Sequence, residues 1–259
     1  MSSVGVLDKV VAILDVFQDG ATRLDPPQVA TSVGISAPTA YRLMGAMAEH
    51  HLLEPEGRDY RLGMRLLRLG AQVSEGVEAR GVSLPHMKAL RDATEETVEL
   101  QILTGHSRVP VEMVTGRRPV RTMGQIGVPL PIHLGASSRV LMAWADEDHA
   151  LELARRSAEQ HADPAWDPAQ YRERLRVVRE QGWEFSAGER DPETSAVSLP
   201  IRDRNGDVVA ALVVSGTATR FADEGHRAGV IVQACDTATA ISSALGHRGE
   251  SASLKRFTS

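Results

Sequence analysis

The chain has 259 residues, enough for one large or two ordinary domains. Its 42% hydrophobic and 24% charged residues exclude collagen-like, coiled-coil-only and wholly disordered proteins. A formal net charge of −5 argues against a generally basic nucleic-acid coat but is compatible with one local DNA contact.

Three short helices are expected first. Apolar residues recur at helical spacing over 6–17. Asp25 and two prolines predict the start of a second helix that ends at Gly34. Ser36 is the expected N-cap of a third helix. The apolar stripe of that helix is Ala40, Leu43, Met44 and Met47.

A hairpin and a longer helix are predicted next. Residues 52–62 fit two short strands about a Pro/Gly/Asp turn, a β-wing. From Met64 the helical period returns and predicts a linker helix over 64–80. Its stripe either joins two copies of the chain or packs on the following domain. The stripe is Leu66, Leu69, Val73 and Val77.

The remainder alternates helical and strand patterns and predicts a mixed α/β domain. Asn205-Gly206 is the strongest hairpin signal. The expected helices cover 84–95, 137–144, 148–158, 168–181 and 223–245, and the expected strands 97–103, 109–114, 183–185, 195–201 and 208–215. The expected divisions are 1–63, the linker 64–80, a second domain over 81–248 and a flexible tail over 249–259.

The outer face of the third helix is small and flat, as entry into a DNA major groove requires. Arg42 suits guanine edges or a phosphate, and Arg58 and Arg61 on the wing suit the flanking backbone. An ordinary three-helix interaction domain is the alternative, since residues 1–80 carry 8 basic and 10 acidic residues. The candidate DNA-binding residues are Ser36, Pro38, Thr39, Tyr41, Arg42, Arg58 and Arg61.

Several sequence blocks, in order, resemble the IclR family of bacterial transcriptional regulators. They lie at 5–10, 34–44, 60–70, 129–133, 135–138, 188–190, 198–201 and 213–216, so the resemblance covers about residues 5 to 245. It implies an α+β fold: an N-terminal winged helix-turn-helix, a linker helix and a C-terminal GAF-like effector-binding domain. It also implies a double-stranded DNA operator, a small-molecule effector and homodimers that often pair into tetramers. The segments GVLDK, LMAW and GERDP resemble the actinobacterial branch that controls leucine and related amino-acid biosynthesis.

The helix start at Gly135 to Ser138 favours an anion, because its first backbone N–H groups are unpaired. A plain capped helix is the alternative. Ser186, Ala196 and Val213 replace an acid, a cysteine and a hydroxyl of the family pattern, so we expect a less polar pocket wall and a branched or bulkier metabolite. The resemblance places the effector contacts at Thr122, Leu130, Ala136, Ser137, Ser186, Ala196 and Ser215.

No catalytic, cofactor or metal motif occurs, and nothing nominates a nucleophile, so we expect no enzyme and no cofactor. The single cysteine, Cys235, is expected to be a buried structural thiol rather than a redox switch. The longest apolar run, Val208 to Val214, is too short to span a membrane, and no secretory signal is recognisable. We therefore expect a cytoplasmic regulator, with a non-DNA-binding sensor or scaffold and a cryptic enzyme as alternatives.

Overall fold

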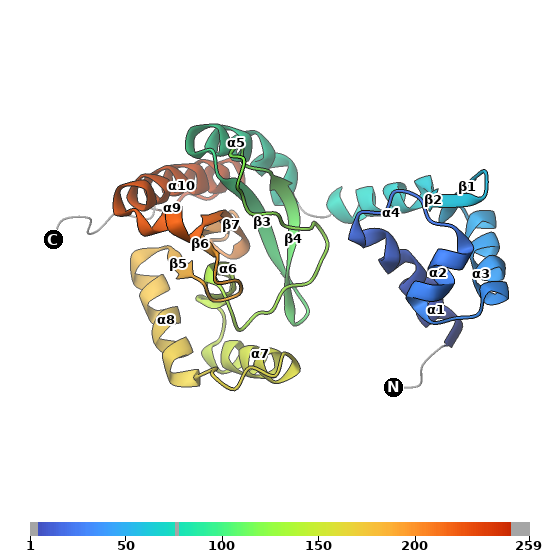
Figure 1. Cartoon of the computed structure of the whole chain (residues 1–259). Coiled ribbons are helices and arrows are strands. Elements are labelled where there is room, and N and C mark those ends of the chain that lie inside the picture. The colour runs from blue at the N-terminus through green and yellow to red at the C-terminus, as the bar shows by residue number, and fades with distance from the viewer. Residues whose placement is uncertain (1–4, 76–77, 250–259) are drawn as a thin grey trace. The chain divides into compact units, whose positions relative to one another are not determined.

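The computed structural model describes residues 5–75 and 78–249, which form two compact units on either side of residues 76 and 77 (Figure 1). Each unit is described by itself. No helix in the described ranges is long and apolar enough to cross a membrane.

In the first unit, helices α1, α2 and α3 and a β-hairpin wing share one core, and α4 follows them. That core joins residues of all three helices to the first strand, and includes Ile13, Val29, Met44 and Leu53. The expected helix-turn-helix and β-wing are confirmed. The elements are α1 (Gly5–Asp15), η1 (Val16–Asp19), α2 (Pro26–Val33), α3 (Ala37–Glu49), β1 (Leu53–Glu56), β2 (Asp59–Leu62) and α4 (Met64–Glu75).

Local chemistry explains the boundaries of α2 and α3. Asp25 and Gln28 cap α2 reciprocally, since each accepts a hydrogen bond from the other's backbone N–H. Gly34 ends α2 with a φ of 72°. Ser36 occupies the N-cap position of α3, but its hydroxyl bonds the Thr39 hydroxyl at 2.8 Å instead of a backbone amide.

The second unit is a five-stranded antiparallel sheet of order β4-β3-β7-β6-β5. Helices α5 and α10 pack on one face, and α6 packs on the other with α8 behind it (Figure 1). The elements are α5 (Glu78–Thr94), β3 (Thr97–Thr104), β4 (Ser107–Val114), α6 (Ala136–Met142), α7 (Glu147–Gln160), α8 (Pro168–Gln181), β5 (Glu184–Ala187), β6 (Thr194–Arg202), β7 (Val208–Thr217), α9 (Ala218–Ala222) and α10 (Glu224–Ala244).

Alternation along the strands divides the sheet into an apolar face and a polar face. Leu100 and Leu212, which are opposite each other on β3 and β7, belong to the core under α5 and α10. Their neighbours Glu99 and Val213 point to the α6 side, where they line a cavity. The polar face thus supplies the floor of the candidate site.

Some predicted boundaries differ from the structure. Helix α5 begins at Glu78 rather than near 84 and contains Pro85, because buried Ala79 packs into the core and tertiary contacts outweigh the proline signal. The short helix α9 was not expected. Cys235 is buried as expected, and burial raises the pKa of its thiol to about 11. The predicted flexible tail beyond residue 249 and the linker residue Val77 lie outside the described residues.

Candidate functional site

The outer face of α3 presents the predicted DNA-reading residues to solvent. The inner face of α3 is buried and includes Ala40, Leu43 and Met44. On its outer face Tyr41 is 55% exposed, and Pro38 and Arg42 are exposed beside it. Thr39, at the start of the helix, is half-buried. In the described part of the chain, Arg42 has no hydrogen-bond or ion-pair partner, so its guanidinium is available to an outside group.

The two wing arginines differ in their surroundings. Arg58 lies exposed in the β1–β2 turn and makes no ion pair with any described residue. Arg61 is opposite Glu54 across the hairpin and donates to its carboxylate at 2.6 Å. Arg58 therefore offers an uncompensated positive charge, whereas Arg61 offers a compensated one.

A cavity of about 60 Å³ lies between the polar face of the sheet and α6. Thr122 and Ser215, from distant segments, share a hydrogen bond of 2.7 Å in its wall. Leu130 does not line the cavity, although its backbone pairs with that of Arg108. The predicted residues that the cavity brings together are Thr122, Ala136, Ser137, Ser186, Ala196 and Ser215.

The cavity also contains charged and amide side chains that sequence reasoning missed. They are Glu99, Gln101, Arg108, Glu189 and Arg190. These side chains add charge to the wall that the residues expected from the resemblance do not supply. Glu99 and Gln101 alternate with apolar residues, a pattern that is equally typical of a solvated sheet face, so no local signal indicates that α6 covers them.

Arg108 is the most unusual of these residues because it is only 4% exposed. Its Nε donates to the Pro131 carbonyl at 2.8 Å, and its Nη1 donates to Gln101 Oε1 at 2.9 Å and to Ser137 Oγ at 2.8 Å. No carboxylate lies within 4.0 Å of it in the described ranges. Burial, together with the nearby charge of Arg190, lowers the pKa of Arg108 to about 10.

A β-bulge turns Arg108 towards the cavity. Leu100 is opposite Glu112, but the next residue, Gln101, is opposite Pro110, so β4 carries one extra residue there. Without that residue, strict alternation puts Arg108 on the same face as Glu112, which pairs with Arg80 of α5 at 3.0 Å. The bulge places Arg108 on the opposite face.

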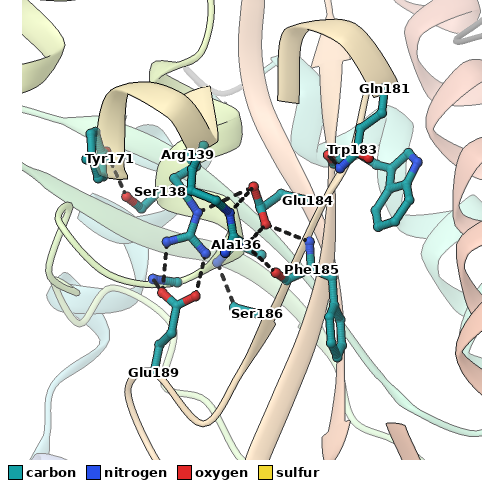
Figure 2. A network of polar contacts seen from close by, with 12 residues as sticks. Ala136, Ser138, Arg139, Tyr171, Gln181, Trp183, Glu184, Phe185, Ser186 and Glu189 are labelled. Carbon is teal, nitrogen blue, oxygen red and sulfur yellow. Dashed lines mark hydrogen bonds and ion pairs between the residues drawn. The ribbon is translucent and has the colours of Figure 1, made fainter. Parts of the chain in front are cut away.

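The start of α6 is occupied by the protein's own side chains (Figure 2). The amide of Gly135 donates to Glu189 Oε2 at 2.9 Å, and that of Ala136 donates to Ser186 Oγ at 3.2 Å. Arg139 donates two further bonds to Glu189, of 2.8 and 2.6 Å. Burial alone raises the pKa of Glu189, but the bonds and charge of Arg139 outweigh it and hold that pKa below its usual value. The predicted anion position at this helix start is therefore already filled.

Two family models match this chain. The description "Bacterial transcriptional regulator IclR C-terminal" matches residues 71–243, and "IclR helix-turn-helix domain" matches residues 6–57. The fold and these matches define a bacterial transcriptional regulator with a helix-turn-helix domain. The chain belongs to the IclR family.

Individual relatives agree with this assignment. The HTH-type transcriptional regulator XynR of Escherichia coli is 29% identical over 249 residues, covering 93% of this chain and 97% of that protein. The crystal structure of Thermotoga maritima IclR superposes with a TM-score of 0.76 at 22% identity, covering 95% and 100% of the two chains. An IclR homologue from Microbacterium hydrocarbonoxydans, solved with 4-hydroxybenzoate, gives 0.73 at 23% identity, covering 93% and 99%. The family consists of regulators, in agreement with the expectation that the chain is not an enzyme.

Proposed function

We propose that this regulator reads an operator with α3 and the wing, and that a small molecule with an anionic group, bound in the α6 cavity, controls its operator affinity. A cytoplasmic location follows from a DNA target. The observation that carries the proposal is Arg108, a buried guanidinium in the cavity wall with no carboxylate within 4.0 Å of it in the described ranges.

An anionic ligand supplies what Arg108 lacks. Its side chain donates hydrogen bonds to three neutral oxygens. These oxygens satisfy its N–H donors but do not neutralise its positive charge. A carboxylate entering the cavity forms a charge-assisted bond in a site shielded from water. The 4-hydroxybenzoate named for one solved homologue is itself a carboxylate, which supports this ligand class.

Thermal denaturation of the full chain tests the anion site. A ligand at about 100 times its Kd stabilises the folded state by about 2.7 kcal/mol, so a panel of carboxylic acids is expected to contain members that raise the Tm. Arg108→Gln should abolish that rise. Arg202→Gln is the control, since Arg202 lies over the Trp144 ring and does not line the cavity. No shift with any acid, or an unchanged shift in Arg108→Gln, contradicts the proposal.

DNA reading is tested by a mobility shift on the DNA next to the protein's own gene, with random DNA as competitor. A retarded complex that resists the competitor and changes with an active acid supports both halves of the proposal. A folded protein that retards no DNA supports the sensor or scaffold alternative.

The proposed DNA reader is a homo-oligomer of even number, because a two-fold symmetric operator needs two reading helices. Large apolar side chains are exposed on α1 and α4, and exposed apolar side chains that gather on a surface are typical of an interface with another protein chain. Of the predicted stripe, Leu66 is half-buried and Leu69 is 45% exposed, while the side chains of Val73 and Val77 lie outside the description. Light scattering should give a dimer or tetramer mass, and Leu67→Glu should lower it. The exposed apolar residues are Val6, Leu7, Val11, Met64, Leu67 and Leu69.

A further inference from the structure

We infer that the α6 cavity selects a zwitterion, a small amino-carboxylic acid whose carboxylate meets Arg108 and whose ammonium meets Glu99. This inference rests on the proposed function and narrows its ligand class. It depends on a second buried charge, of opposite sign, in the same cavity wall.

Glu99 is that second charge. It is 7% exposed, lies on β3 and lines the cavity. Its Oε2 accepts a hydrogen bond from Gln101 Nε2 at 2.7 Å. In the described part of the chain, no Lys, Arg or His nitrogen lies within 4.0 Å of its carboxylate. The other acid of the wall, Glu189, is already paired with Arg139.

Gln101 sets the spacing between the two charges. Its amide group donates to Glu99, and its carbonyl oxygen accepts from Arg108 at 2.9 Å and from Ser137 at 2.8 Å. These bonds fix the orientation of the amide, so a single carboxamide separates the carboxylate from the guanidinium. An ammonium and a carboxylate on the same carbon, or on adjacent carbons, can lie along this row.

The charges discriminate between ligands as well as attract them. A simple anion that reaches Arg108 leaves Glu99 buried and unpaired, and it adds a like charge near it. A zwitterion satisfies both side chains at once. The small volume of about 60 Å³ and the apolar contacts of Ala196 and Val213 favour a short aliphatic side chain.

Calorimetry on the full chain tests the inference with matched probes. L-alanine, L-valine and L-leucine are each compared with the 2-oxo acid of the same carbon skeleton. We expect at least one amino acid to bind about tenfold or more tightly than its oxo acid, since losing one charged partner in a buried site is costly.

Glu99→Gln keeps the size of the side chain and removes its charge. It should lower the affinity for the amino acid about tenfold or more and leave the oxo acid unchanged or stronger. Glu112→Gln is the matched control, because it removes a buried carboxylate from the other face of the same sheet and should leave the ratio unchanged. If Glu99→Gln does not fold, Glu99→Asp is used instead. It keeps the charge and should retain the preference for the amino acid over its 2-oxo acid.

The outcomes separate the two proposals. An oxo acid or another simple carboxylate that binds as tightly as the amine, and needs Arg108, overturns the zwitterion and leaves the proposed function standing. An unchanged preference in Glu99→Gln also overturns the zwitterion. Failure of every acid to bind overturns both.

Discussion

The proposed DNA-reading face of α3 and the cavity beside α6 hold their arginines in opposite surroundings. Arg42 and Arg58 are exposed on local elements and have no partner in the described chain, and in the proposed function their partner is the DNA. Arg108 is buried and is held by three neutral oxygens, those of Gln101, Pro131 and Ser137. An exposed arginine keeps its hydration and destabilises the fold little. A buried arginine loses its hydration and must be held by surrounding hydrogen-bond acceptors, and their fixed positions make it selective for the shape and charge of a ligand.

The largest effect is expected where a buried pair is broken. Arg139→Ala removes the guanidinium that pairs with half-buried Glu189 and one of the two that pair with buried Glu184, which should lower the free energy of unfolding by about 3 kcal/mol. Denaturant titration followed by tryptophan fluorescence reports this, because Trp144, Trp166 and Trp183 all lie in the second unit. An unchanged midpoint would show that the buried network does not stabilise the unit.

Arg42→Ala tests the exposed side of the comparison. Loss of a base-edge contact should weaken operator binding by about 1–3 kcal/mol and leave random DNA almost unaffected. Mobility shifts on both DNAs measure the ratio, and the Tm of the variant should equal that of the wild type because Arg42 has no partner within the described chain. Equal losses on both DNAs would make Arg42 a phosphate contact.

The wing arginines sharpen the comparison further. Arg58→Ala should weaken specific and random DNA alike and reduce the slope of log K against log salt concentration by about 1. Arg61→Ala should reduce the slope less, because its charge is already compensated by Glu54. Identical slopes for the two variants would mean that the Glu54 pair opens on DNA.

The smallest effect is expected at an exposed ion pair. Arg155 bonds Glu152 and Glu159 along α7, and all three side chains are largely in solvent. Arg155→Ala should leave the denaturation midpoint unchanged within error, because water screens such pairs. A midpoint shift as large as that of Arg139→Ala would refute the distinction between the exposed and the buried arginines.

Local features of this chain were predictable because the residues that determine them are neighbours in sequence. The Asn205-Gly206 hairpin is one case: Asp203 accepts from the Asn205 and Asp207 amides, and Gly206 has a φ of 88°. Arg108 was missed because a bulge reverses the side of the sheet on which it lies. Glu99 was missed because it is covered by α6, and the packing of that helix on the sheet depends on tertiary contacts. The reading face depends on one helix, but the cavity depends on contacts that no local pattern encodes.

The position of β7 in the sheet bears on how the second unit folds. It is the last strand along the part of the chain that the structure describes, yet it lies in the middle of the order β4-β3-β7-β6-β5. Its Ser215 bonds Thr122 across 93 positions, and Arg220, just beyond it, bonds Glu96 across 124. Contacts this distant in sequence make folding slow. During synthesis the cavity cannot close until β7 leaves the ribosome, so a nascent chain stopped before residue 208 lacks both the central strand and the complete cavity wall.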